Sequence, residues 1–424
     1  MSRYLVISAD CHAGLPNADY RDWLEPAYRN AFDEYQTERI VLNEELRERG
    51  LRNEEFAEEW ERENEEGLRG GWDAGRRDKE LDADGVAGEV IFPDADAVTA
   101  GASAPFGAGL GASGEHDPEL LMAGARAHNR WLAELCTDSP HRRAGVAIVP
   151  ILHDVDAAVV EIKRAADSGL RGGILIPSMW QPYPPYHDAR YDPVWATCQD
   201  LELAVHVHSG AADRAAYGEH VGIYVSEVRW WSTRPLWFLL WAGTFERFPR
   251  LHFVVTECGA FWAADLLWTS DIAYDREHAA RKLGGQLSEH LTMRPSEYFD
   301  RNCFIGASNT RRRELARRYE IGIGNLMWGN DFPHPEGTWP HTKEWLRRAF
   351  WDLPGDETQT ILGGAAAACY GFDVEALRPV AERIGPTTTE LGQTGEGLEQ
   401  WVNLRAAGRP WLTGIEAPAV PAGD

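Results

Sequence analysis

Four short polar motifs in this sequence hold the side-chain types that bind divalent metal ions. They are Asp10 with His12, His206 with His208, Glu257, and Asp331. Carboxylate oxygen together with imidazole nitrogen suits Zn²⁺, Mn²⁺ or Fe²⁺, whereas Ca²⁺ and Mg²⁺ prefer oxygen almost throughout. Several carboxylates buried together without a metal would bear a heavy cost of desolvation and mutual repulsion. If these motifs meet in space, a divalent metal site is therefore expected.

Each motif ends an apolar run that has the length of a buried strand. Side chains alternate along a strand, so Asp10 and His12 share one face, and His206 and His208 do the same. The last motif lies in MWGNDFPHPEGTWP, residues 327–340. Its glycines and prolines exclude a helix and indicate a strand that ends in a sharp turn.

Eight such apolar runs occur along the chain, separated by segments with a helical pattern. They span residues 4–12, 88–94, 144–150, 172–178, 203–210, 252–259, 303–308 and 326–331. Near-continuous apolar strands are typical of a parallel sheet covered on both faces. Eight strand–helix units predict an α/β fold, a (β/α)8 TIM barrel. A doubly wound open sheet is the alternative, but no GxGxxG follows the first strand. The glycine-rich stretch 104–114 lacks the Gly-Lys-Ser/Thr of a phosphate loop and is interpreted as an ordinary loop.

Active sites of TIM barrels lie at the carboxyl ends of the strands, and the four motifs end predicted strands one, five, six and eight. Taken singly, each motif has a simpler explanation. The strand-one pair could be structural, the two histidines could be a hydrogen-bonded core pair, and Glu257 could pair with an arginine. At four strand ends of one barrel, the metal interpretation is favoured.

The barrel is predicted to span residues 1–383. Its first connection, about residues 13–87, is long and rich in charged helical sequence, which would lie over the barrel mouth or form a dimer contact. Other helical patterns cover residues 157–167 and 311–320. Residues 384–424 are rich in Gly, Pro and Thr, and we expect an extended C-terminal tail on the body or on a neighbouring subunit.

Overall charge and composition argue against some classes of partner. Lysine and arginine number 42 against 67 aspartates and glutamates, a net charge of −25 that argues against nucleic acid and anionic membranes. No apolar run reaches the roughly 18 residues of a membrane span, and the first residues lack the apolar core of a signal peptide. Six scattered cysteines without CxxC indicate reduced thiols in a cytoplasmic protein. The aromatic segment 229–243 predicts a homodimer or larger homo-oligomer.

With these motifs in place, the sequence resembles the amidohydrolase superfamily, in particular the branch that includes aminocarboxymuconate-semialdehyde decarboxylase and the γ-resorcylate decarboxylases. The resemblance covers about residues 1–375 and leaves the first insertion and the tail outside. Its most specific piece is MWGNDFPHPEGTWP. The supporting pieces are ISADCH, LDADGVAGEVIFPD, YDPVWATCQDLELAVHVHSG, FERFPRLHFVVTECGAFW and ILGGAAAACYGFD.

This resemblance implies a mononuclear metal site. Asp10 and His12 match an acidic variant of the family's His-x-His pair. His208 matches the strand-five ligand, and Asp331 matches the strand-eight aspartate that binds or adjoins the metal and moves protons. One divalent ion is expected, Zn first, with Mn or Fe as alternatives. The sequence departs from the family at Glu257, where members often carry a catalytic histidine. A carboxylate there could ligate the metal or act as a base, but it cannot stay cationic.

The leading expectation is a metal-dependent hydrolase of a small organic substrate, such as an amide or lactone, with a metal-activated water and Asp331 as proton shuttle. The alternative is a non-oxidative decarboxylase of a hydroxy- or keto-carboxylate. The acidic residue at strand one favours this alternative, and the missing strand-six histidine counts against it. A barrel that has lost catalysis and only binds a ligand is the third hypothesis.

Four further residues are candidate contacts of the substrate or its surroundings. His334 lies three residues after Asp331 and could also act in catalysis, or it could be a backbone-bonded turn residue. Trp180 and Tyr183 lie on the loop after strand four, where simple loop packing is the alternative role. His206 would act from just outside the metal ligands or contact the substrate.

Overall fold

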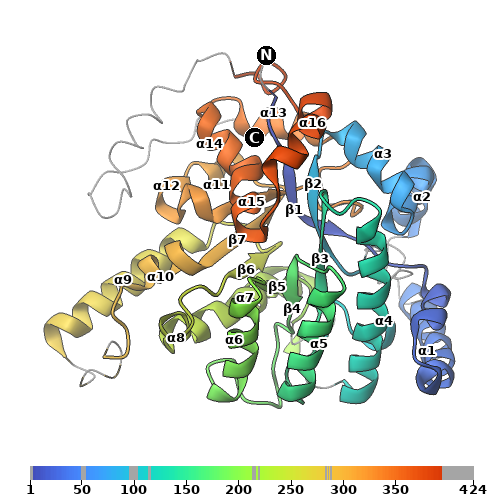
Figure 1. Ribbon diagram of the computed structural model, residues 1–424, viewed down its shortest axis with the longest axis horizontal. Coiled ribbons are helices and arrows are strands. Elements are labelled where there is room, and N and C mark those ends of the chain that lie inside the picture. Colours follow the sequence, from blue (N-terminus) through green and yellow to red (C-terminus); the bar gives the residue numbers. More distant parts are fainter. Residues whose placement is uncertain are drawn as a thin grey trace.

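The computed structural model of the chain is a barrel of eight parallel strands, which confirms the predicted TIM barrel (Figure 1). The strands are β1 Ile7–His12, β2 Gly88–Phe92, β3 Arg143–Ile148, β4 Gly173–Leu175, β5 Val205–His208, β6 Phe253–Thr256, β7 Cys303–Ser308 and β8 Leu326–Gly329. They pair in sequence order, and a parallel bridge between Cys11 and Phe332 links the end of β1 to the chain just after β8. The structure describes residues 3–48, 54–94, 104–112, 116–212, 216–217, 220–281, 284, 286 and 289–393.

Helices follow every strand and surround the sheet (Figure 1). After β2 to β7 these are α4 Pro118–Thr137, α5 Val155–Asp167, α6 Asp192–Asp200, α7 Val221–Trp241, α8 Thr244–Arg247, α9 Ala263–Ala280, α10 Pro295–Asn302, α11 Arg312–Leu315 and α12 Arg318–Ile321. After β8 come α13 Thr342–Phe350, α14 Gly355–Gln359, one π-helical turn at Thr360–Gly364, α15 Ala365–Tyr370 and α16 Val374–Ile384. The helical pattern at 311–320 is thus two short helices, because the backbone leaves helical geometry at Arg317, with φ −99° and ψ 10°. Among the described residues, no helix combines the length and the hydropathy of a membrane span.

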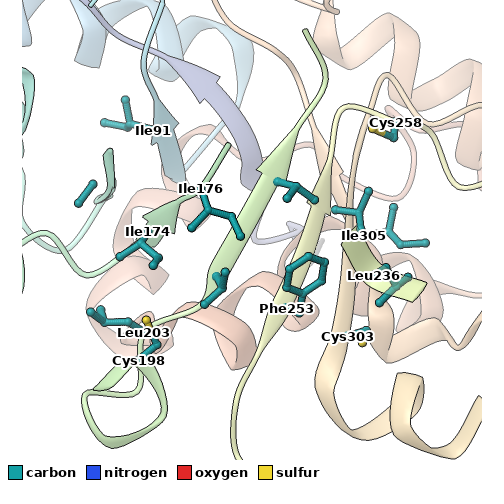
Figure 2. Packing of buried hydrophobic residues seen from close by; sticks show 14 of the residues in the cluster. Ile91, Ile174, Ile176, Cys198, Leu203, Leu236, Phe253, Cys258, Cys303 and Ile305 are labelled. Carbon is teal, nitrogen blue, oxygen red and sulfur yellow. The ribbon is translucent and has the colours of Figure 1, made fainter. Parts of the chain in front are cut away.

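Two apolar layers lie on the two faces of the sheet. Side chains such as Ile7, Val90 and Phe92 point into the barrel, where Tyr370 at the end of α15 and Phe372 just after it join them. The alternate residues point outward and pack under the helices. Figure 2 shows part of this outer layer, including Ile174, Phe253 and Ile305. Strand alternation therefore sends every second side chain of β5 and β8 into the barrel. In β1 the pairing register shifts between Ser8 and Cys11, so the inward positions change from Ile7 and Ala9 to Asp10 and His12.

The long first connection contains a 3₁₀ turn at Asn17–Trp23 and the helices α1 Arg29–Glu48, α2 Glu54–Leu68 and α3 Ala74–Asp84. Its last helix is fastened to the barrel by Arg77, which is fully buried. The Arg77 guanidinium donates two hydrogen bonds to the Glu89 carboxylate on β2, at 2.8 and 2.7 Å. It also donates to the carbonyls of His12 and Gly70, both at 2.9 Å. The Arg77 side chain thus joins the insertion to both β1 and β2.

The first part of the predicted tail lies on the barrel. Thr387 forms an antiparallel bridge with Arg3, and the Gln393 side chain donates to the carbonyls of Phe350 and Leu353 at 3.0 and 3.1 Å. Residues 394–424, including the apolar island GRPWLTGI, lie outside the described part of the chain.

Candidate metal centre at the carboxyl ends of the strands

Two carboxylates and three imidazoles meet inside the barrel mouth. The Asp10 carboxylate lies 3.4 Å from Nε2 of His12 and 3.2 Å from Nε2 of His208. The Asp331 carboxylate lies 3.2 Å from Nε2 of His12 and 2.9 Å from Nδ1 of His334. All five side chains are buried. The four side chains expected to be metal ligands therefore come together, and His334 lies against them.

Hydrogen bonds between the ends of β1 and β8 place the two carboxylates side by side. The Asp331 amide donates to the Asp10 carbonyl at 2.8 Å, and the His12 amide donates to the Phe332 carbonyl at 2.6 Å. A Cβ at Gly329 would lie 2.7 Å from the Cβ of Asp10, so only glycine allows this approach. Asp331 itself has φ +59°, a conformation that L-residues rarely adopt outside functional or tight-turn positions.

A main-chain carbonyl orients each of the three imidazoles. Nδ1 of His12 donates to the Pro93 carbonyl at 2.7 Å, and Nδ1 of His208 donates to the Ser209 carbonyl at 2.9 Å. Nε2 of His334 donates to the Asp94 carbonyl at 2.9 Å. Because a carbonyl can only accept, the facing nitrogen carries the hydrogen and the other nitrogen turns toward the carboxylates. Metal-ligating histidines are oriented in this way in proteins.

Two atoms of this cluster lack a hydrogen-bond partner within the described chain: Nε2 of His12 and Oδ1 of Asp331. They lie 3.2 Å apart, but their geometry does not satisfy a hydrogen bond. Buried polar atoms without partners are rare in folded proteins. Both atoms are good ligands for a divalent cation, so the donor set fits such an ion at this point.

The carboxylates and imidazoles shift each other's pKa values in opposite directions. Burial alone would raise the pKa of Asp10, but the charge and hydrogen bond of His208, together with the nearby His12 imidazole, hold it below its usual range. Asp331 has a lowered pKa in the same way, since His334 and His12 outweigh burial. Burial alone would lower the pKa of His12, but the close approach of the Asp10 and Asp331 carboxylates raises it. Without a metal, the cluster is held by imidazolium–carboxylate attraction, and a bound cation would replace those protons.

Glu257 lies at the edge of this cluster, just after β6. It has φ +57°, and its carboxylate is 3.4 Å from Nδ1 of His208. Burial and the negative charge of Asp331 raise the pKa of Glu257 to about 7. One oxygen each of Glu257, Asp331 and the exposed Glu336 lie within 4.8 Å of one another. A carboxyl group that titrates near neutral pH is suited to take up or release a proton.

In the metal-free protein, Glu257→Gln is expected to weaken the dependence of stability on pH. A carboxyl whose pKa rises from 4.5 to about 7 on folding binds more protons in the folded state, so its contribution to stability falls as pH rises through that range. The contribution is of order 1–3 kcal/mol. Melting temperatures in EDTA at pH 5, 6, 7 and 8 measure it. Glu134→Gln, at an exposed position of α4 outside this cluster, is the control and should leave the profile unchanged. Equal slopes for wild type and Glu257→Gln would contradict the shifted pKa.

The three remaining candidates lie in different surroundings. His206 is fully buried one layer deeper in the barrel, where its Nε2 donates to the Gly172 carbonyl at 2.9 Å and its ring stacks on Tyr370. Burial lowers the pKa of His206 to about 3, so the ring is neutral. Trp180 is buried against aromatic neighbours, including Phe238. Any effect of His206 or Trp180 on a substrate would therefore pass through neighbouring side chains.

Tyr183 lies beside a cavity of about 230 Å³ at the same end of the barrel. Its hydroxyl is 3.2 Å from Nδ1 of His153, and both residues line the cavity with Pro150, Leu152 and several residues of α4. None of the five clustered metal-site residues is among those lining it. The cavity therefore adjoins the loops after β3 and β4 and does not enclose the cluster.

Sequence patterns missed several residues that shape the cluster. The Ser308 hydroxyl on β7 donates a short hydrogen bond to the Asp10 carboxylate. Pro93, Asp94 and Ser209 act through main-chain carbonyls, which leave no residue-type signal in a sequence. Only the position of these residues at the ends of the predicted strands could have indicated them.

Comparisons with known proteins agree with this architecture. The family described as Amidohydrolase matches residues 9–372. No curated protein sequence matches the chain significantly. Among solved structures, 5-carboxyvanillate decarboxylase from Sphingomonas paucimobilis is 21% identical, with 87% of this chain and 99% of that chain covered and a TM-score of 0.60. A 2,6-dihydroxybenzoate decarboxylase from Rhizobium is 19% identical, with 88% and 100% covered and a TM-score of 0.59. A 5-carboxyvanillate decarboxylase from Novosphingobium aromaticivorans, complexed with manganese and a hydroxy-methoxy-nitrobenzoic acid, is 16% identical, with 87% and 96% covered and a TM-score of 0.61.

Proposed function

Because this chain belongs to the amidohydrolase family, we propose that it is a metal-dependent, non-oxidative decarboxylase of an aromatic hydroxycarboxylate. The observation that carries the proposal is the buried cluster in which Nε2 of His12 and Oδ1 of Asp331 lack hydrogen-bond partners among the described residues. The proposed ligands are Asp10, His12, His208 and Asp331. Decarboxylation is favoured over hydrolysis because structurally similar proteins are named as decarboxylases of 5-carboxyvanillate and 2,6-dihydroxybenzoate, and because strand one carries an acidic ligand.

A divalent ion bound here would polarise a substrate carboxylate and an adjacent hydroxyl oxygen. In the proposed reaction the bond between the ring carbon and the carboxylate breaks, CO₂ leaves, and the ring carbon keeps the electron pair and takes one proton. Asp331 is proposed to deliver that proton. Its low pKa means that it must first receive the proton, and Glu257, which titrates at about 7, is the neighbouring store. His334, paired with Asp331, would keep the Asp331 carboxylate in place.

Hydrolysis remains the second candidate, because Glu257 can also act as a general base toward water. In that case Glu257 would take the proton of the attacking water, and Asp331 would pass a proton to the leaving group. The raised pKa of Glu257 is the observation that favours hydrolysis as the second candidate.

One assay separates the candidates. Metal-loaded protein is incubated with hydroxybenzoates, lactones and amides in D₂O and in ¹⁸O-water, and the products are analysed by mass spectrometry. We expect CO₂ and a product with one ring deuterium and no ¹⁸O. An acid that contains ¹⁸O would establish hydrolysis instead, and turnover of no substrate would leave a binding barrel. Asp331→Asn is expected to lower turnover at least about 100-fold, because it removes the proton carrier and weakens one proposed metal ligand.

The identity of the metal and the assembly state are further parts of the proposal. Manganese is named with several structurally similar proteins, while zinc, manganese and iron all suit the donor set. A homodimer or larger homo-oligomer is proposed to cover α7, on which Val225 and Trp230 are 55% and 48% exposed. Analytical ultracentrifugation tests this assembly state, and a monomer at micromolar concentration would refute it.

The cytoplasmic location, expected from the cysteines, stays a prediction that cell fractionation would check.

A further inference from the structure

The segment just after β2 holds two imidazoles of the cluster through consecutive main-chain carbonyls. The Pro93 carbonyl accepts from His12 and the Asp94 carbonyl accepts from His334, at 2.7 and 2.9 Å. The two rings stack with 4.0 Å between their centroids and 28° between their planes. The backbone path through Pro93 and Asp94 therefore determines where both rings lie.

The side chain of Asp94 fastens this path to the glycine-rich segment 104–112. One carboxylate oxygen of Asp94 accepts from the Ala104 amide at 2.9 Å, and the other accepts from the Leu110 amide at 2.7 Å. Asp94 has φ +67°, a backbone conformation that needs local support in a non-glycine residue. A Cβ at Gly109 would lie 2.1 Å from the Asp94 carboxylate, so a glycine is required beside it.

Segment 104–112 is itself packed on two sides. The Phe106 ring lies 5.8 Å from Phe32 and 5.4 Å from Tyr35, both on α1 of the long insertion. Leu110 packs against the apolar interior of the barrel. The segment is thus a firm support for the Asp94 carboxylate, and it connects the insertion to the cluster.

We propose that Asp94 is a positioning residue of the metal centre. Its carboxylate, bound to segment 104–112, fixes its own main-chain carbonyl and the carbonyl of Pro93, and these two carbonyls set the orientation of His334 and His12. The Asp94 carbonyl contacts only His334, while His12 is held by the carbonyl of the neighbouring Pro93, so Asp94 acts only through these two rings. The inference rests on the proposed metal site. Groups that orient metal ligands from outside the ligand set influence metal affinity by about 10- to 100-fold.

The test uses Co²⁺ as the probe, because its visible absorption depends on the geometry of its ligands. The dissociation constant of Co²⁺ and its absorption spectrum are measured for full-length wild type, Asp94→Ala and Asp94→Asn. We expect about 10-fold weaker binding and a shifted spectrum for Asp94→Ala. An intermediate effect is expected for Asp94→Asn, whose amide oxygen can still accept one of the two hydrogen bonds.

Asp117→Ala is the matched control. The Asp117 carboxylate also accepts from two main-chain amides, those of Glu119 and Leu120 at 3.0 Å, but it caps α4 and does not contact the cluster. We expect its Co²⁺ affinity to stay within about twofold of wild type and its spectrum to be unchanged. A general loss of loop or helix order would affect both alanine variants, whereas a positioning role separates them.

Gly109→Ala tests the same contact from the other side and serves if Asp94→Ala does not fold. Its methyl group would push against the Asp94 carboxylate, so it should weaken Co²⁺ binding in the same direction. In the double variant with Asp94→Ala, no further loss is expected, because the two changes break one contact. Wild-type affinity and spectrum in Asp94→Ala, or in Asp94→Asn and Gly109→Ala, would overturn the inference. Failure of wild type to bind Co²⁺ would instead overturn the proposed metal site.

Discussion

Asp10→Ala/His208→Ala is expected to lose the metal ion altogether. Wild type should contain about one Zn, Mn or Fe per chain, and the double variant less than about 0.1, because two of four ligands are gone. Asp10 contacts both His12 and His208, so its removal also takes away one of the two carboxylates that lie beside His12. Elemental analysis of the purified proteins gives the metal content. The melting temperature should rise with added metal for wild type only, since a ligand stabilises only the folded state that binds it.

A pair of the same residue types at the opposite end of the barrel controls for this variant. Nδ1 of His252 donates to the Cys369 carbonyl, and Asp373 caps α16. His252→Ala/Asp373→Ala should lose some stability but keep its metal. Metal retained in Asp10→Ala/His208→Ala would mean that the ion binds elsewhere. Wild type without metal, even after reconstitution, would remove the basis of the proposed decarboxylase.

Arg77→Ala is expected to destabilise the protein by about 3–5 kcal/mol, because it leaves a buried carboxylate without its main partner. Arg77 and Glu89 are both fully buried and joined by two hydrogen bonds. Burial would raise the pKa of Glu89, but the charge of Arg77 reverses this and lowers it. Within the described chain, Arg143 is the only other cation within ion-pair distance of Glu89, at 3.6 Å. Arg143 also forms an ion pair with Asp78. Urea denaturation at pH 7 measures the loss.

Arg76→Ala, on the same helix, is the matched control. Arg76 pairs with Glu66 and Glu80 near the surface, where ion pairs contribute about 0–1 kcal/mol. The double change Arg77→Met/Glu89→Gln should recover part of the stability lost in Arg77→Ala, because it removes the unpaired buried charge. Equal losses in the Arg76 and Arg77 variants would show that Glu89 finds another partner.

The eight strands could be predicted from the sequence because their apolar runs are long, frequent and separated by clear breaks. Alternation also correctly placed Asp10 and His12 on one face. Alternation could not show that two residues on the same face of a strand lie at different depths in the barrel. His206 and His208 both point into the barrel, but two residues of strand span roughly 6.6 Å, so His208 reaches the cluster while His206 lies in the apolar interior.

Contacts between distant loops escaped prediction for a different reason. The hydrogen bond between His334 and the Asp94 carbonyl joins loops 240 residues apart, and neither residue type nor spacing in the sequence predicts it. The sequence places Trp180 on the loop after strand four, yet its buried ring packs on Phe238 of α7, a contact that only the folded structure reveals. Local patterns determine elements well, whereas the surroundings of a side chain depend on which loops meet.

The carbonyl support of the imidazoles has a consequence for how the site tolerates mutation. Pro93, Asp94 and Ser209 each contribute an acceptor that every amino acid possesses. Most substitutions at Pro93 and Ser209 should therefore be tolerated in a saturation mutagenesis screen, although both positions orient proposed metal ligands. Single-residue insertions or deletions between 93 and 94, or next to 209, should be as damaging as loss of a proposed ligand, because they shift the acceptor itself. The support of the proposed metal centre is thus encoded in chain length and backbone path more than in side-chain identity.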